Sequence, residues 1–331
     1  MHRFFNQLSR VGLNGFFLSL LLMVFLAWLF PELGSKDSFL PLDHVTFYGV
    51  SVIFFFYGLR LSPEKLRAGL GSWRLHLVVQ STTFLLLPLI AQLIIYFFGT
   101  NNDPSWIGFF YLAALPSTVS SSVVMVSIAC GNMPAAIFNA SISSVIGIFI
   151  TPLWMSFYGH QADGDIDLSN VIVKLCLQVL LPVIFGLLLH GKFGTWAERH
   201  KTWLKNFDQL VILLIVFTAF SESFLNDMFA DFSYVQIVVL GALMLLFFFM
   251  IALLMYLLAS WLKFSREDRI TILFCGSKKS LVQGAVMGRV LFPHPVTLGI
   301  ILLPLMLYHA LQLLSGSVIA QAMADDERDL S

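Results

Sequence analysis

The stretch Cys275-Gly276-Ser277-Lys278-Lys279-Ser280 is the most informative part of this sequence. It puts two lysines near the middle of an apolar segment that runs from Ile270 to Val290. A charged residue at the centre of a membrane helix costs at least about 2.5 kcal/mol on insertion scales, and such residues mark functional sites. The motif is therefore the first candidate for a functional site.

The rest of the chain has the composition of a membrane protein. Hydrophobic residues make up 58% of its 331 residues and charged residues 11%, whereas about 25% of an average soluble domain is charged. Apolar segments long enough to cross a bilayer, which takes about 20 residues, fall at 11–30, 45–62, 76–98, 106–129, 134–158, 168–190, 208–224, 233–262, 269–289 and 296–321. The three cysteines are scattered among apolar segments, so neither a disulfide framework nor a metal site is indicated.

The basic residues between these segments favour one side of the membrane. If the N-terminus is cytoplasmic, fourteen of the nineteen lysines and arginines fall in cytoplasmic segments, and two, Lys36 and Arg289, fall outside. Positive charge collects on the cytoplasmic side of membrane proteins. The sequence thus predicts a multi-pass protein of the cell inner membrane with both termini in the cytoplasm and an acidic cytoplasmic tail at 322–331.

The lysine motif has a second copy in the fourth apolar segment. Leu115-Pro116-Ser117-Thr118-Val119-Ser120 matches the stretch from Cys275 to Ser280, because each has a helix-disturbing residue, a serine, two other residues and a serine. The segment after each copy contains a similar proline motif, Thr151-Pro152-Leu153 or Leu303-Pro304-Leu305. The chain is therefore predicted to contain two copies of a five-span unit.

An odd number of spans per unit gives the two copies opposite orientations in the membrane. The predicted fold is an all-α polytopic membrane protein of ten transmembrane helices, a single domain over 1–331, with one five-helix repeat at 11–158 and a second, inverted one at 168–321. Pro116 and Gly276 each precede hydroxyl side chains, a combination expected where a membrane helix is interrupted. Helices four and nine would then be broken and cross at mid-membrane, which indicates a transporter binding site.

Seven motifs, spread over nearly the whole chain, together match a known family. They are Phe30-Pro31-Glu32-Leu33-Gly34, Gly58-Leu59-Arg60-Leu61, Ala114 to Ser122, Gly131-Asn132, Asn139-Ala140-Ser141, Thr151-Pro152-Leu153-Trp154 and Cys275 to Gln283. On these motifs the chain resembles the bile acid/sodium symporter (BASS) superfamily, in its SBF-like bacterial branch related to the vertebrate "family member 7" solute carriers. The resemblance implies a ten-helix carrier of two inverted repeats, in which a panel of helices rocks against a core.

The chain departs from this family at the sodium sites. The sodium-coupled members have a glutamate and a glutamine in the ninth span that bind sodium, where this chain has Gly276 to Ser280 without a carboxylate. Alignment on Gly131-Asn132 puts Ser122 at the family's serine but Val123 at its asparagine. The family's sodium ligands are therefore not carried over to this chain. No cofactor is expected, and bound sodium is kept as an alternative.

The lysines offer another cation for the same place. Backbone carbonyls at the ends of half-helices coordinate Na⁺ and also accept hydrogen bonds from an ammonium group. We hypothesise that Lys278 or Lys279 replaces the bound sodium and, if it titrates, couples transport to protons. A cavity with lysines, hydroxyls and no acid is positive, so the predicted cargo is a small or amphipathic organic anion, to which a lysine would also bind.

The candidate substrate- or ion-binding residues are polar side chains of the two motifs and of the fifth span. They are Ser117, Thr118, Ser120, Ser121, Ser122, Asn139, Ser141, Ser277, Lys278, Lys279, Ser280 and Gln283. Each has a simpler interpretation. The serines are also typical of close helix packing, the lysines would satisfy carbonyls in a rigid core, and a lone Asn139, His309 or Gln312 is more often an interhelical hydrogen-bond partner than a ligand.

Three other functions stay open at this point. They are a sodium-coupled symporter with relocated ligands, a membrane regulator that does not transport, and, least favoured, a hydrolase in which Ser277 or Ser280 is activated by a neighbouring lysine. Since the sequence contains no Gly-x-Ser-x-Gly or His-Glu-x-x-His motif, we predict that the protein is not an enzyme. The expected partners are the anionic solute, the lipid bilayer and protons or sodium, with no nucleic acid.

Overall fold

Helices make up the described structure, a computed structural model that covers residues 15–60, 70–99, 104–118, 120–159, 173, 176–227, 233–292 and 295–330. The helices are α2 (Gly15–Leu29), α3 (Pro31–Gly34), α4 (Leu42–Arg60), η1 (Leu70–Ser72), α6 (Trp73–Ser81), η2 (Thr82–Leu86), α7 (Leu87–Phe98), α8 (Pro104–Ala114), α9 (Ser120–Ile128), α10 (Met133–Gly159), η3 (Cys176–Leu180), α12 (Leu181–Arg199), α13 (Lys201–Leu225), α14 (Tyr234–Trp261), α15 (Arg266–Ser277), α16 (Leu281–Leu291) and α17 (Pro295–Leu330).

The length and composition of these helices agree with a membrane protein. Seven helical stretches within the described residues are long and apolar enough to cross a membrane, and shorter apolar helices lie at Leu18–Leu29 and Ser105–Ala114. The prediction of an all-helical membrane protein is confirmed by these stretches and by the absence of strands from the described ranges.

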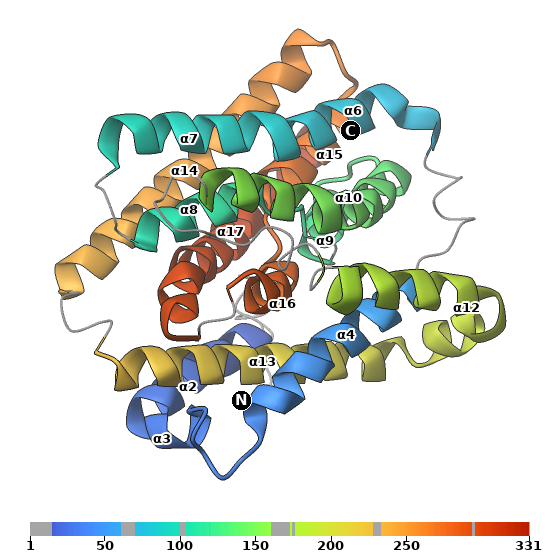
Figure 1. The fold of residues 1–331 in the computed structure, drawn as a ribbon. Coiled ribbons are helices and arrows are strands. Elements are labelled where there is room, and N and C mark those ends of the chain that lie inside the picture. Colours follow the sequence, from blue (N-terminus) through green and yellow to red (C-terminus); the bar gives the residue numbers. More distant parts are fainter. Residues whose placement is uncertain are drawn as a thin grey trace, which may run out of the picture.

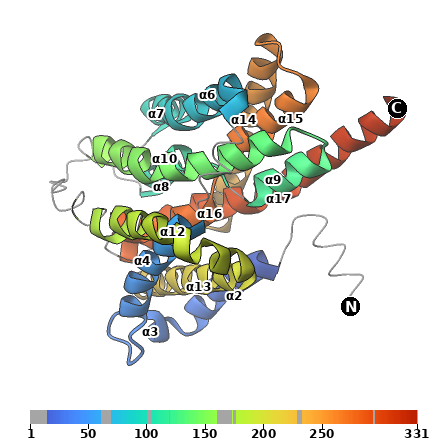
Figure 2. The same ribbon diagram turned by 90° about the vertical axis from the view of Figure 1, so that its right-hand side faces the viewer.

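The helices form two layers (Figures 1 and 2). One layer, called the panel here, contains α2, α3, α4, α12 and α13; the other, called the core layer, contains α6 to α10 and α14 to α17. The elements from α6 to α10 separate α4 from α12 in the sequence, so the panel is assembled from two distant parts of the chain. The two interrupted helix pairs, α8 with α9 and α15 with α16, both belong to the core layer.

Two glycines hold α4 and α12 together inside the panel. A Cβ on Gly186 would overlap the backbone oxygen of Phe55, and a Cβ on Gly58 would overlap the backbone oxygen of Val183. Small residues are the usual means by which membrane helices bring their backbones into contact, because lipid provides no hydrophobic driving force between them. The close crossing of α4 and α12 therefore depends on the absence of side chains at both positions.

The panel meets the core layer at the end where α4 and α17 begin and α13 and α16 end. Arg289 of α16 forms an ion pair with Asp43 of α4. Nearby, a Cβ on Gly299 of α17 would overlap Ser223 of α13, so these two helices are also in direct contact. An ion pair and a helix crossing thus join the two layers at one end of the molecule.

The interruptions of the two paired helices have different local causes. After α8, Pro116 has no backbone N–H and disfavours helical geometry in the residue before it. In the second pair, α15 continues through Gly276 and ends at Ser277, after which Lys278 is extended, with φ −97° and ψ 138°. The expectation that Gly276 interrupts the helix is therefore wrong. This glycine instead lets α14 approach, because a Cβ there would overlap the Met255 side chain.

A π-helix precedes Pro88 in the third apolar segment. The N–H of Leu87 bonds to Thr82 O, five residues back, and Pro88 has no N–H to offer to the carbonyl of Phe84. The indole N–H of Trp154 in α10 donates to Phe84 O instead, at 2.7 Å. The widened turn also includes Thr83, whose carbonyl is used at the crossover described below.

The predicted boundaries differ from the structure in two places. The span predicted at 168–190 ends instead at Arg199, and α13 begins at Lys201, so the expected loop between the sixth and seventh spans is helical. Similarly, α17 continues to Leu330 through most of the tail at 322–331. An apolar run measures the length of chain that lipid covers, but helices continue into polar residues with good helix propensity, such as Lys, Arg, Glu and Ala.

We expect Gly186→Ala to destabilise the protein, because the added methyl group meets backbone that cannot move aside without separating α4 from α12. Overpacking of this kind costs about 1–3 kcal/mol. The matched control is Gly191→Ala in the same helix, where a Cβ meets nothing within 4 Å. Thermal unfolding in detergent should give a lower midpoint for Gly186→Ala alone, and equal midpoints for the two variants would contradict the close crossing.

Candidate functional site

The carbonyl end of α8 is held by the ammonium group of Lys279. The last carbonyls of a helix have no partner within it and carry partial negative charge. Lys279 Nζ donates to the backbone oxygens of Ala113 and Leu115, both at 2.7 Å, and lies 3.4 Å from Thr83 O in the π-helix. The side chain is fully buried. A lysine from the second interruption thus supplies the cation for the first one.

The other carbonyls of this helix end also find donors from distant segments. Thr151 of α10 donates its hydroxyl to Ala114 O at 2.8 Å, and the backbone N–H of Ser280 donates to Pro116 O at 3.0 Å. The second bond joins the two interruptions backbone to backbone. The chain therefore crosses itself at Pro116 and Ser280, and this region, from 113 to 118 and 277 to 280 with its neighbours, is called the crossover below.

Helix α17 holds the other side of the crossover. Gln312 accepts from the N–H of Lys279 and donates to its carbonyl, both at 2.8 Å, so that one amide satisfies both backbone groups of an extended residue. Tyr308 donates its hydroxyl to Ser277 O at 2.6 Å, and His309 lies 3.0 Å from the Gln312 amide nitrogen. The expectation that Gln312 is an interhelical hydrogen-bond partner is confirmed.

Lys278 has the opposite environment. Its side chain is also fully buried, but its Nζ has no hydrogen-bond partner among the described residues. The Nζ lies 6.0 Å from the centre of the Phe274 ring and faces Gly316 of α17, where a Cβ would be 3.0 Å from it. A buried ammonium group without a hydrogen-bond partner is costly, which makes the surroundings of Lys278 a candidate ligand site.

Further buried polar atoms at and around the crossover have no partner among the described residues. They are Ser117 Oγ, Ser277 Oγ, both side-chain amide atoms of Gln283, Thr83 Oγ1 and Asn139 Nδ2. Helices α8, α9, α10 and α16 contain no acidic residue. Most buried polar groups in proteins are hydrogen-bonded, so a cluster of unpaired ones needs an explanation, and a ligand is one.

The hydroxyl groups of four other predicted residues form hydrogen bonds within the protein. Ser122 Oγ donates to Phe274 O at 3.1 Å and joins α9 to α15, Thr118 accepts from Ser121 at 3.4 Å, and the Ser280 hydroxyl caps α16 by accepting from Gln283 N–H. Ser120 begins α9, and its side chain lies outside the described set.

The fifth-span candidates fall on different faces of α10. Asn139 is buried and accepts from Gln80 at 3.1 Å. Ser141 bonds within its own helix to Ile137 O, so it is not brought to the crossover. Ser143, four residues after Asn139, instead accepts from the N–H of Ser117 at 3.0 Å. Ser143, and not Ser141, thus contacts the crossover, and a binding role for Ser141 stays a prediction.

Sequence comparison with known proteins identifies the family of this chain. Residues 14–325 match the SBF-like CPA transporter family. The protein belongs to this family. The chain is 38% identical over 318 residues to "Putative symporter YfeH" of Escherichia coli, covering 95% of this chain and 94% of the relative. It is 31% identical over 319 residues to "Sodium/bile acid cotransporter 7-B" of Xenopus laevis, covering 94% and 92%. The resemblance noted from the motifs is confirmed.

The crossover of this SBF-like CPA transporter includes residues that the sequence did not single out as site residues. Ser143, Thr151, Tyr308 and Gln312 all bond to the two interruptions. The four-residue spacing of Asn139 and Ser143, one turn of α10, was the available signal for Ser143. Within the described residues no group of three or more His, Cys, Asp and Glu could hold a metal ion.

The geometry also bears on the hydrolase hypothesis. A serine nucleophile needs a hydrogen bond of about 2.6–3.2 Å to its base. Among the described residues, neither Ser277 Oγ nor Lys278 Nζ has any partner, and Lys279 Nζ is occupied by carbonyls. No serine–lysine pair is therefore formed at the crossover in this conformation.

We expect Gln312→Leu to lower the thermal midpoint of the purified protein more than Tyr308→Phe. The first variant leaves the buried N–H and C=O of Lys279 unpaired, at about 1–3 kcal/mol for each group, whereas the second removes one donor from Ser277 O. Both side chains are on α17 and both replacements are apolar. An equal or smaller effect of Gln312→Leu would show that the extended link does not depend on this amide.

Proposed function

We propose that the protein is a secondary active transporter that moves a small or amphipathic organic anion by alternating access, with Lys279 in the place of a bound sodium ion. The observation that supports this best is the position of Lys279 Nζ between the carbonyl oxygens of Ala113 and Leu115. Carbonyl ends of interrupted membrane helices are the groups that coordinate cations in carriers of this architecture. In this chain the cation is part of the protein.

The proposed architecture has ten spans in two inverted five-helix repeats, at 11–158 and 168–321. Support comes from the seven long apolar stretches, the shorter α2, and the two interrupted pairs in the fourth and ninth positions. The excess of basic residues in the segments on one side favours cytoplasmic termini in the cell inner membrane. The panel and the core layer are then the two bodies that move relative to one another.

The two lysines have separate roles in this proposal. Lys279 is neutralised by the negative end of the α8 dipole and stays with it, so sodium is not needed there. Lys278 Nζ has no hydrogen-bond partner among the described residues, and it provides the charge that binds the anion, assisted by the hydroxyl of Ser277 and the amide of Gln283, which are also unpaired there. The names of the vertebrate relatives, sodium/bile acid cotransporter 7, agree with an amphipathic anion as cargo. Protons are the proposed coupling ion.

Sodium binding gives a direct test of the Lys279 assignment. Lys279→Ala vacates a space lined by the carbonyls of Ala113, Leu115 and Thr83, so we expect this variant to gain a stabilisation by NaCl over choline chloride at equal ionic strength. Bound ion at a hundredfold excess over Kd contributes about 2.7 kcal/mol. The wild type and Lys278→Ala should show no sodium effect. Stabilisation of the wild type by sodium would instead identify a sodium-coupled symporter with ligands elsewhere.

Transport of anions tests the Lys278 assignment. In proteoliposomes we expect saturable uptake of an organic anion, driven by an inward proton gradient without sodium. The two anions to test are taurocholate, an amphipathic sulfonate, and lactate, a small carboxylate. Lys278→Met should lower uptake at least about tenfold, because a lost charge-assisted hydrogen bond is worth about 1.5–3 kcal/mol. The exposed Lys263 supplies the control, since Lys263→Met should leave uptake unchanged. Full activity of Lys278→Met would refute the assignment.

A further inference from the structure

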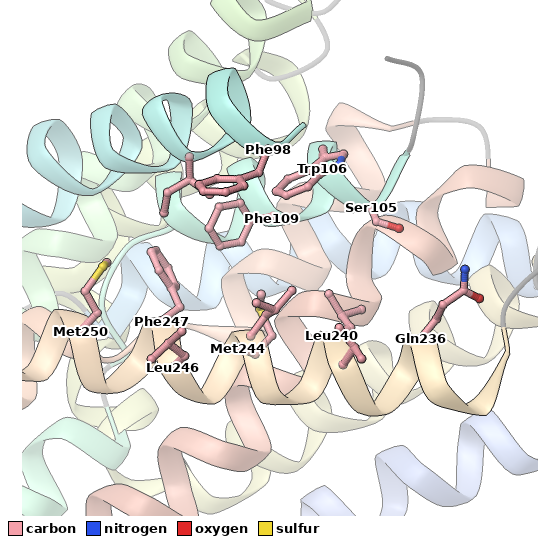
Figure 3. A pocket seen from close by; sticks show the side chains of 13 residues that line it. Phe98, Ser105, Trp106, Phe109, Gln236, Leu240, Met244, Leu246, Phe247 and Met250 are labelled. Atoms are coloured by element: carbon pink, nitrogen blue, oxygen red, sulfur yellow. The ribbon is translucent and has the colours of Figure 1, made fainter. Parts of the chain in front are cut away.

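A groove of about 800 Å³ is lined by residues of α7, α8 and α14 (Figure 3), three helices of the core layer (Figure 1). Ligand sites in proteins have volumes of about 300–1,000 Å³. The floor of the groove is buried protein, with Met244, Phe247 and Phe109 at 2%, 4% and 6% exposure. Its rim is open, because Phe98 is 73% and Leu246 66% exposed. Three membrane helices therefore form a concave surface where lipid would otherwise meet a convex one.

The polarity of the groove changes along its length. Ser105 and Gln236 lie at one end, close to the first residues of α8 and α14, and Met250 lies at the other, with Leu240, Met244 and Phe247 between them (Figure 3). From Gln236 to Met250 the helix rises about 21 Å, somewhat more than half of the about 30 Å hydrocarbon core of a bilayer. The groove thus has a polar end at one membrane surface and an apolar length of about one leaflet.

We propose that this groove binds one acyl chain of a phospholipid, from the leaflet in which α8 and α14 begin. An acyl chain with its ester and head group has the same polarity gradient as the groove, and it reaches this face from the bilayer directly. Trp106, which also lines the groove, is of the residue type that anchors membrane proteins at head-group depth. In the orientation proposed above, the leaflet is the outer one.

The groove contacts the crossover through aromatic rings. The ring centres of Phe109 and Phe247 are 4.9 Å apart, and those of Phe247 and Tyr308 are 6.1 Å apart. Tyr308 is the residue whose hydroxyl holds Ser277 O at 2.6 Å. A chain that fills the groove therefore packs against Phe109 and Phe247, and Phe247 in turn contacts the ring of Tyr308 that supports the interrupted ninth segment. The lipid site is separate from the anion site but adjoins its scaffold.

Quenching of tryptophan fluorescence by brominated phospholipid tests the site. One variant keeps Trp106 and Trp154, with the other five of the seven tryptophans replaced by phenylalanine. The depth-matched variant keeps Trp28, which is 60% exposed near the end of α2, in place of Trp106. Trp154 stays in both because its N–H bonds to Phe84 O, and a variant with Trp154 alone gives its share of the signal. Both proteins are kept in detergent micelles that contain rising fractions of dibrominated phosphatidylcholine.

We expect half-maximal quenching of Trp106 at a brominated fraction at least about threefold lower than for Trp28. The reason is that the groove at Trp106 selects phospholipid, whereas the surface at Trp28 exchanges with the bulk. Coincident curves would overturn the proposal, because both residues would then report ordinary boundary lipid. Val239→Phe, which fills the groove, should move the Trp106 curve to that of Trp28, whereas Leu253→Phe, on the exposed face of α14 outside the groove, should not. An unchanged Trp106 curve in Val239→Phe would likewise overturn it.

If the multiple replacements prevent folding, native mass spectrometry of the otherwise unmodified protein replaces the fluorescence. Wild type and Leu253→Phe should retain one phospholipid after delipidation that Val239→Phe loses. Equal lipid retention by all three proteins would overturn the proposal. Because Lys278 and Lys279 are untouched in every variant, sodium and anion responses can be measured on the same samples, and a failure of the lipid site is distinguishable from a failure of the transport proposal.

Discussion

The contact between the Lys279 ammonium and the carbonyl end of α8 is the interaction on which the crossover depends. A helix that stops in the middle of a membrane leaves carbonyls with no water to satisfy them, and each such group costs several kcal/mol. Here Lys279 Nζ serves two of them, at Ala113 and Leu115, and its own burial is made tolerable by the same oxygens and by Thr83 O of the π-helix. The interruption and the charge therefore stabilise each other.

This reciprocity explains why two adjacent lysines are not redundant. The Lys279 ammonium group is bonded to backbone carbonyls, whereas Lys278 Nζ has no hydrogen-bond partner among the described residues. Helices α8, α9, α10 and α16 contain no acidic residue. An extended backbone from Lys278 to Ser280, held by the paired hydrogen bonds of Gln312, sends the two side chains to different elements. The site thus has one buried lysine bound to backbone carbonyls and, next to it, one whose Nζ has no hydrogen-bond partner in the part of the chain that the structure describes.

Sequence reasoning reached the two interruptions, because charge and proline inside apolar runs are strong local signals. It also selected the two lysines, whose role in binding stays a prediction. It could not say which lysine faces α8, since the expected 100° offset of helical neighbours does not apply to an extended link. It misplaced one break at Gly276, because a glycine in a membrane helix serves helix contact as readily as helix termination. The roles of Thr151 and Tyr308 depend on which distant segments pack together, which no local pattern encodes.

The ion pair between Arg289 and Asp43 bears on how the two layers part. This pair joins the panel to the core layer, whereas the Arg60–Asp208 pair, at 2.7 Å, lies wholly within the panel. The Arg289 side chain is 7% exposed, so a separation of the layers at that end would uncover a charge and require its rehydration. Water entering the gap is then a requirement of the movement and not its by-product. The barrier to exposing this end should accordingly fall as the ionic strength of the bathing solution rises.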